Sequence, residues 1–301
     1  MPIQVDSSVL ANLGRLSSLA PLHQPHNIAG IESCKALFPD AIQIACFDSA
    51  FHRTHPWVAD TFALPRAYYD RGVRRYGFHG LSYESVMQQL RTRAAEAASG
   101  RLVVAHLGAG ASMCAICDGR SIGSTMGFSA LDGLPMGTRC GQLDPGVVLY
   151  LIEEEGMSAR DIEDLLYKES GLKGLSGISG DIRDLEAAGT DAADQAMDYF
   201  AFRAVREAGA LTATLGGLDA LVFCGGIGEN SWRMRERICR GLDWLGVRLE
   251  ETANRSGKFA ISSNGSRVRV FVVRTNEEEV IARHAFSCLR TCSAQQPCEV
   301  P

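Results

Sequence analysis

The sequence lacks the features that mark several broad classes of protein. No apolar run approaches the roughly 20 residues that a membrane-spanning helix needs. The opening residues, MPIQVDSS, contain no basic segment followed by an apolar one, so we expect no secretory signal. The net charge is −5 and no run of like charges exceeds four residues, which argues against a nucleic-acid groove. We therefore expect neither a membrane nor a nucleic acid as a partner.

Two common nucleotide-binding fingerprints and a zinc-site pattern are also missing. The chain has no G-x-x-x-x-G-K-[ST] and no complete G-x-G-x-x-G after a strand, which excludes a P-loop and a Rossmann turn. The ten cysteines are scattered, and the pair Cys114 and Cys117 has no second pair at zinc-ligand spacing. We expect reduced, buried thiols and a cytoplasmic location.

Four apolar segments have the character of buried strands. Continuous apolar runs that end in an abrupt polar or glycine turn are typical of strands covered on both faces. They lie at residues 42–48, 102–108, 220–226 and 268–273.

Helices are expected between these strands. Apolar residues from 197 to 215 recur at steps of three and four until Gly216 ends the pattern. Further helices should begin after Ser158, which resembles a cap, and after Asn276, where acidic residues suit the first turn. The 301 residues, 46% of them apolar, thus predict an α/β protein of two lobes with a cleft between them.

Residues 125–146 form an unusual stretch, with five glycines, two prolines and one arginine, Arg139, in 22 residues. Gly costs backbone entropy and Pro lacks an N–H, so the stretch predicts a shaped loop rather than a long helix or central strand. The planar guanidinium of Arg139 suits a phosphate or a carboxylate on a ligand. Taken alone, Arg139 fits equally well a role in satisfying carbonyls or a carboxylate of the protein itself.

Two more glycine turns follow predicted strands, at residues 106–112 and 225–231. Glycines there let backbone N–H groups approach an anion, and the second turn leads into a helix N-terminus. A tight turn explains either one alone about as well. Together with the arginine loop, they favour the phosphates of a nucleotide.

Three ionisable residues stand out, each with a structural alternative. Asp48 ends the first predicted strand, where it could instead cap the segment that follows it. His79 lies between Phe78 and a glycine, as a hydrogen-bond donor in an apolar wall or as a core histidine bonded to a carbonyl. Glu277 begins a helix, where it either favours the dipole or faces a magnesium ion.

These segments, taken in order, resemble a known family. YGFHG, HLGxG, MGTRCG, an Asp-x-Arg at residues 181–183, GGIGEN and TNEE are similar to the motifs of the acetokinase family, from about residue 19 to about residue 289. The family belongs to the sugar-kinase/Hsp70/actin superfamily and includes acetate, propionate and butyrate kinases. The resemblance implies a two-lobed actin-like (ribonuclease-H-like) ATPase fold and a homodimer formed through the second lobe. It also implies the reversible reaction of ATP and acetate to give ADP and acetyl phosphate, with Mg²⁺, or Mn²⁺ in its place, as cofactor.

The resemblance assigns roles to individual residues. Arg139 and His79 would stabilise the equatorial oxygens of the transferred phosphoryl group, and Asp48 would be the proton acceptor or donor. Glu277 would be a metal ligand, and Leu22 and Phe78 match positions that line the acyl pocket. ATP would be held by His106, Leu107, Gly108, Ala109 and Gly110, by Asp181, Ile182 and Arg183, and by Gly226, Ile227, Gly228, Glu229 and Asn230.

Acid–base chemistry qualifies one of these roles. Acetate is already ionised at pH 7, so no base is needed to create the nucleophile. We therefore expect Asp48 to act mainly through the metal ion.

The same resemblance bears on domain organisation. Full-length members begin with a strand and an Asn-x-Gly-Ser-Ser-Ser phosphate turn that this sequence does not contain. We expect residues 1–50 and about 278–301 to form an incomplete first lobe, and residues 51–277 to form the second lobe with the nucleotide motifs. A chain that binds nucleotide or dimerises without turnover is the alternative to an active kinase.

Overall fold

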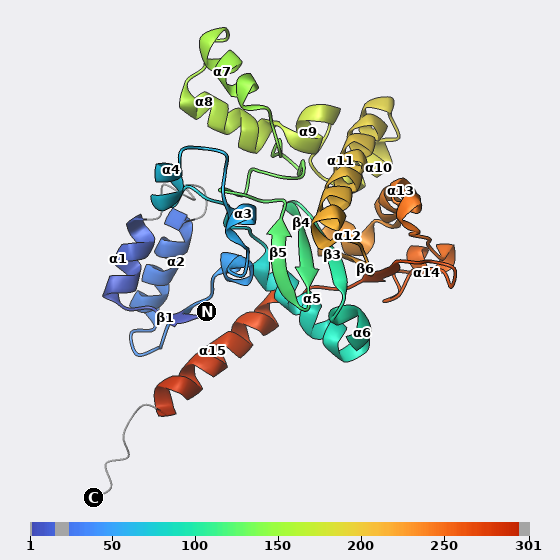
Figure 1. The fold of residues 1–301 in the computed structure, drawn as a ribbon. Helices are drawn as coiled ribbons and strands as arrows, with labels where there is room; N and C mark the ends of the chain where they lie inside the picture. The colour runs from blue at the N-terminus through green and yellow to red at the C-terminus, as the bar shows by residue number, and fades with distance from the viewer. Residues whose placement is uncertain (1, 16–23, 295–301) are drawn as a thin grey trace, which may run out of the picture.

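The structure is a computed structural model that describes residues 2–15 and 24–294 (Figure 1). Its centre is a five-stranded mixed sheet in the order β5-β4-β3-β6-β7. β3 runs parallel to β6, and β6 runs parallel to β7, whereas β4 and β5 are antiparallel additions on the other edge. The strands are β3 (Arg101–Leu107), β4 (Ala111–Cys117), β5 (Arg120–Ser124), β6 (Ala220–Cys224) and β7 (Arg269–Val272). Three of the four predicted strands are thereby confirmed.

The strands read as continuous apolar runs because each face of the sheet is covered. Along β3, Val103 and Ala105 belong to one core, together with Phe200 of α11 (Asp191–Leu215). The alternate residues Leu102 and Val104 belong to a second core, formed with helix α5 (Gly80–Arg93). Figure 1 shows α11 and α5 on opposite sides of the central strands.

The predicted long helix is confirmed as α11. The Thr190 side chain accepts a hydrogen bond from the N–H of Ala193 at its start, and Gly216 ends it with φ +69°, a conformation that glycine adopts without strain. The helix predicted after Ser158 is α8 (Ala159–Asp164), which begins with a capping box to Asp161. The helix predicted after Asn276 is α15 (Glu277–Ala294), which extends away from the sheet (Figure 1).

The prediction of a buried strand at residues 42–48 is wrong. Only β2 (Ile44–Ala45) forms there, and it pairs antiparallel with β1 (Ile3–Gln4) in a separate two-stranded sheet. β2 has one neighbour and remains half-buried, and Ile42 is exposed. The chain then turns into a 3₁₀ helix, η2 (Asp48–His52).

Shorter elements connect these parts. None of the helices in the described part of the chain is both long and apolar enough to cross a membrane. The eight cysteines whose side chains are described are free thiols, and Cys114, Cys224 and Cys239 are buried as predicted, whereas Cys34 is exposed. The remaining elements are α1 (Ser7–Arg15), α2 (Gln24–Leu37), α3 (Trp57–Asp60), α4 (Arg66–Asp70), α6 (Ala95–Ala98), α7 (Pro145–Glu153), η3 (Leu165–Glu169), α9 (Gly171–Ser176), α10 (Ile182–Ala188), α12 (Gly225–Asn230), α13 (Trp232–Gly241), η4 (Asp243–Leu245) and α14 (Glu251–Arg255).

Candidate active site

The glycine-rich turns surround a cavity of about 720 Å³. The parallel strands β3 and β6 both end at this edge of the sheet, which is where ligands bind in open α/β folds. Eight of the residues predicted to hold ATP line the cavity: Gly108, Ala109, Asp181, Ile182, Arg183, Gly226, Ile227 and Asn230. Sequence reasoning did not name five others as site residues: Gly137, Thr138, Gly180, Glu186 and Ser231. Gly137 and Thr138 lie inside the quoted motif MGTRCG, so the sequence contained a signal for these two.

Close backbone contacts explain the glycines around this cavity. A Cβ on Gly180 would lie 2.7 Å from the carbonyl oxygen of Gly137, and a Cβ on Gly137 would lie 3.0 Å from the carbonyl oxygen of Gly180. Gly225, with φ +76°, packs on the carbonyl of Leu107. The turns therefore present backbone rather than side chains to a ligand, as phosphate-binding loops do.

Some predicted ATP residues take structural positions instead. Leu107 is fully buried in the core, and the Gly228 carbonyl accepts a hydrogen bond from Arg235. The Glu229 carboxylate accepts hydrogen bonds from the N–H groups of Gly225 and Thr275, at 3.0 and 3.1 Å. None of these three residues is among those that line the cavity.

Asp181 and Arg183 form an ion pair at the cavity wall. The Arg183 guanidinium donates to the Asp181 carboxylate at 2.6 Å, and the Arg183 N–H donates to it at 2.9 Å. These bonds lower the pKa of Asp181 to about 2. Asp181 thus caps α10, and the Arg183 side chain, 84% exposed, extends into solvent beside the cavity.

Arg139 and His79 converge at the turn that follows β3. A Cβ on Gly110 would lie 3.0 Å from Nη2 of Arg139 and 3.0 Å from Nε2 of His79. The two side chains, far apart in sequence, thus face one point beside the cavity-lining residues Gly108 and Ala109. A guanidinium and an imidazole that face one point can together bind an oxyanion.

The Arg139 guanidinium contacts the protein with one nitrogen and faces the site with another. Its Nη1 donates to the carbonyl of Ala130 at 2.7 Å, while Nη2 points toward Gly110. Burial lowers the pKa of the Arg139 guanidinium below its ordinary value, yet an arginine remains charged at neutral pH. The loop carbonyl therefore orients a cation whose other nitrogen faces the site.

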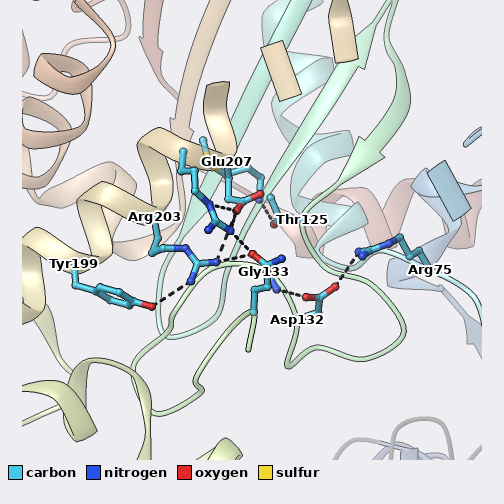
Figure 2. A network of polar contacts seen from close by, with 10 residues as sticks. Arg75, Thr125, Asp132, Gly133, Tyr199, Arg203 and Glu207 are labelled. Carbon is cyan, nitrogen blue, oxygen red and sulfur yellow. Dashed lines mark hydrogen bonds and ion pairs between the residues drawn. The ribbon is translucent and has the colours of Figure 1, made fainter. Parts of the chain in front are cut away.

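Polar contacts anchor the loop on both sides of Arg139 (Figure 2). Before it, Asp132 accepts a hydrogen bond from Arg75 at 2.8 Å. After it, Gln142 accepts one at 3.0 Å from Arg203, a buried residue of α11 that also donates to the Tyr199 hydroxyl at 3.1 Å. A loop rich in glycine is thereby fixed to two neighbouring segments.

His79 is held by its backbone and its ring. It adopts φ +58°, a conformation rare for residues other than glycine, directly before α5. The ring stacks on His106, with centroids 4.1 Å apart, and Nδ1 lies 2.8 Å from the Ser112 hydroxyl. Burial, followed by the charges of His106 and Arg139, lowers the pKa of His79 well below 6.5. Burial also lowers the pKa of His106, to about 4.

Asp48 contacts the start of α5 rather than capping its own segment. Its carboxylate accepts hydrogen bonds from the N–H groups of His79 at 2.6 Å and Leu81 at 3.1 Å. The carboxylate thus satisfies N–H groups at the helix N-terminus and fixes the unusual backbone of His79.

Glu277 is the carboxylate that best fits a magnesium ion. It begins α15 and accepts a hydrogen bond from Ser82. Its charge raises the pKa of the nearby His106, although the burial of His106 lowers that pKa by more. Within residues 2–15 and 24–294, no three His, Cys, Asp or Glu side chains gather as a metal cage. Nucleotide sites hold Mg²⁺ with one or two carboxylates plus phosphate oxygens and waters, so a single glutamate suits that chemistry.

Of the two residues predicted to line an acyl pocket, Phe78 is among the described residues. Leu22 lies outside the described residues. Phe78 is partly buried against the core that contains Val103 and Phe200. Its carbonyl accepts a hydrogen bond from Nε2 of His52 at 2.9 Å.

Comparison with known proteins identifies the family. Residues 2–283 match the model of the Acetokinase family, nearly the whole chain. The chain belongs to the acetokinase family. An acetate kinase of Methylocella silvestris is 61% identical to it, in an alignment covering 97% of this chain and 72% of that relative.

Solved structures of acetokinase relatives have the same fold. Porphyromonas gingivalis acetate kinase superposes with a TM-score of 0.89 at 38% identity, covering 96% of this chain and 74% of that one. A propionate kinase of Francisella tularensis subsp. tularensis gives 0.90 at 36% identity, covering 94% and 74%. The predicted α/β, actin-like fold class and the family resemblance are both confirmed, while the roles of individual site residues stay predictions.

Proposed function

We propose that this protein is an acetate kinase that transfers the γ-phosphoryl group of ATP to acetate, reversibly, giving acetyl phosphate and ADP. The observation that carries the proposal is the convergence of Arg139 and His79 on one point at Gly110, beside a cavity walled by glycine turns. The 61% identity to an acetate kinase supports the choice of acetate.

The chain's residues contribute mainly position and charge. Phosphoryl transfer passes through a loose transition state, so binding and electrostatic stabilisation do most of the work. Backbone N–H groups of the turns at Gly108 and Gly226 would hold the nucleotide phosphates. Arg139 and the imidazole of His79 would then contact the equatorial oxygens of the group in transfer. Acetate is ionised at neutral pH, so it attacks without the help of a base.

Magnesium is the proposed cofactor, held by Glu277 together with the nucleotide phosphates, and it would supply neutralisation of phosphate charge when bound. The role expected of Asp48 through the metal remains a prediction, and its contacts to His79 and Leu81 give it a positioning role as well.

Acyl selectivity is proposed to depend on Phe78 and Leu22. One extra methylene changes substrate discrimination by only about 1–3 kcal/mol in a hydrophobic pocket. Propionate is therefore expected as a weaker substrate rather than a rejected one.

We further propose the domain division expected from the sequence, with residues 1–50 and about 278–301 in the first lobe and residues 51–277 in the second. The cavity-lining residues all lie within the second of these parts, which supports the division. A homodimer and a cytoplasmic location are proposed from family membership.

The purified chain tests the activity directly. Acetate, propionate or butyrate is incubated with ATP and Mg²⁺, and hydroxylamine traps the acyl phosphate as a hydroxamate. We expect hydroxamate to form fastest with acetate. An Arg139→Ala preparation, purified identically, reports contaminating kinase and should be slower by about 10³-fold. Nucleotide binding by calorimetry without any hydroxamate would establish the non-catalytic alternative and overturn the proposal.

A further inference from the structure

A buried chain of hydroxyl groups leads from the interior to the ring of His79. Tyr83 is fully buried on α5, and its hydroxyl is hydrogen-bonded to the hydroxyl of Ser112. The Ser112 hydroxyl, fully buried on β4, lies 2.8 Å from Nδ1 of His79. Sequence reasoning assigned neither Tyr83 nor Ser112 a role.

The position of Ser112 follows from the register of the sheet. Ser112 pairs with His106 across β3 and β4, and His106 is the ring on which His79 stacks. The strand pair therefore supplies both a flat surface for the imidazole and a hydroxyl at its edge. The other ring nitrogen, Nε2, faces Gly110 and Arg139.

Counting protons fixes the direction of these bonds. Among the described residues, the Ser112 hydroxyl is the one hydrogen-bond partner of the Tyr83 hydroxyl. The Ser112 hydroxyl in turn bonds only the Tyr83 hydroxyl and Nδ1 of His79. If His79 carried its proton on Nδ1, it would donate to Ser112. Either the Tyr83 proton or the Ser112 proton would then lack an acceptor in a fully buried place, which is costly.

The opposite direction pairs both hydroxyl protons and leaves the Nε2 proton of His79 facing the site. Tyr83 donates to Ser112, and Ser112 donates to an unprotonated Nδ1. Burial raises the pKa of Tyr83 well above 10, with smaller effects from Cys114 and Asp48, so the phenol keeps its proton. Burial, with the charge of Arg139, keeps His79 neutral, so its one proton is on Nε2.

We propose that Tyr83 and Ser112 are positioning residues that fix the tautomer of His79, so that a neutral imidazole presents its Nε2–H to the phosphoryl group beside Arg139. This inference rests on the proposed function for its catalytic consequence, whereas the tautomer is a property of the chain itself. Without the hydroxyl chain, Nε2 would be free to present a lone pair, which repels an anionic phosphoryl oxygen.

Nitrogen NMR reads the tautomer without reference to activity. In protein labelled with ¹⁵N-histidine, long-range proton–nitrogen correlation distinguishes protonated from unprotonated ring nitrogens, and a His79→Gln sample assigns the signal. We expect Nδ1 of His79 to be unprotonated and Nε2 to be protonated at neutral pH. A proton on Nδ1, or a doubly protonated ring, overturns the proposal.

Paired variants test the two hydroxyls. Ser112→Ala is expected to shift the tautomer toward Nδ1–H and to lower kcat by 10- to 100-fold, on the order of the loss when an outer partner of a ligating histidine is removed. KM for ATP should not change. Tyr83→Phe should give a smaller loss in the same direction, because Ser112 can still donate to Nδ1.

Two matched controls separate these effects from general damage to the fold. Ser124→Ala removes a buried serine hydroxyl of β5 that has no partner among the described residues. Tyr76→Phe removes a hydroxyl that donates to the carbonyl of Gly72. Both controls should keep the His79 tautomer and kcat. If Ser112→Ala keeps them as well, or if Ser124→Ala loses as much, the inference is wrong. If the unmodified chain has the expected tautomer but forms no hydroxamate, the proposed function and the catalytic consequence fail while the tautomer assignment stands.

Discussion

The guanidinium of Arg139 and the imidazole of His79 face a common point, each with a nitrogen 3.0 Å from where a Cβ on residue 110 would lie. They are sixty positions apart in the sequence, and the fold brings them together because one lies on an anchored loop and the other at the start of α5. Gly110 keeps the space between them open.

Gly110→Ala therefore places a methyl group between the two side chains. We expect kcat to fall on the order of 100-fold, the loss typical of a displacement near 1 Å at a reacting centre. The hydroxamate assay measures it. Gly30→Ala is the control, because a Cβ there meets no atom within 4 Å. Full activity in Gly110→Ala would show that the phosphoryl group binds elsewhere.

Asp48→Asn tests how the carboxylate acts on the site. The amide keeps one acceptor oxygen and turns an NH₂ group toward a backbone N–H, either that of His79 or that of Leu81. We expect stability to fall by about 1 kcal/mol, as for loss of a helix cap. Activity should also fall, because the backbone of His79 is released.

Added magnesium separates the positioning role of Asp48 from the metal-mediated one. If positioning through the bonds to His79 and Leu81 dominates, raising Mg²⁺ does not restore kcat in Asp48→Asn. A titration in which kcat recovers with Mg²⁺ would instead establish the metal-mediated role expected from the sequence.

Arg235 supports the turn that closes one side of the cavity. This arginine of α13 is 1% exposed and donates to the carbonyls of Gly228 and Glu229, and to both the side chain and the carbonyl of Asn254. Arg235→Met removes these four hydrogen bonds, although the Asn254 carbonyl still accepts one from the N–H of Gly257. We expect a loss of about 3 kcal/mol or more in the free energy of unfolding, measured with urea.

The same variant should weaken nucleotide binding, because Gly226 and Asn230 belong to the supported turn. Arg233→Met is the matched control, since the Arg233 side chain is 58% exposed on the same helix. Equal stability of the two variants would contradict a supporting role for Arg235.

Two buried histidines predict how stability depends on pH. Burial lowers the pKa of His52 and of His106 from 6.5 to about 4. Between pH 4 and pH 6.5 the unfolded chain therefore binds more protons than the folded one. The stability that the two neutral histidines contribute is complete above pH 6.5 and is lost as the pH falls toward 4. We expect each histidine to lower the free energy of unfolding by about 2 kcal/mol between pH 7 and pH 5.

Urea denaturation across this pH range provides the measurement. His52→Gln removes one of these groups, so its unfolding free energy should fall by about 2 kcal/mol less between pH 7 and pH 5 than that of the unaltered chain, whatever its effect at pH 7. An unfolding free energy that stays constant from pH 7 to pH 5 in the unaltered chain would rule the prediction out.

Local composition predicted the parts of the site made by backbone. Gly108, Gly226 and Arg139 were identified because two glycine turns at strand ends, together with one arginine among glycines, favour the phosphates of a nucleotide, whereas each feature alone fits a structural role about as well. In the structure, residues of these separate segments line one cavity.

The side chains that support the site were beyond sequence reasoning for physical reasons. Ser112 matters through its strand register with His106, and Tyr83 through the packing of α5, and both depend on tertiary contacts. Arg235 lies in the strongly charged segment Trp232–Gly241, which gave no sign that one arginine would be buried. The strand expected at residues 42–48 failed because apolar content does not report how many neighbours a strand has.

Gly137 and Gly180 touch backbone to backbone, so a Cβ at Gly180 would force the backbone to move and a Cβ at Gly137 would be unusually tight. Each residue is therefore locked by the other, and no replacement at one site can compensate for a change at its partner. In a saturation library selected for function, this pair should remain invariant, and designers who wish to reshape the nucleotide pocket must begin from different positions.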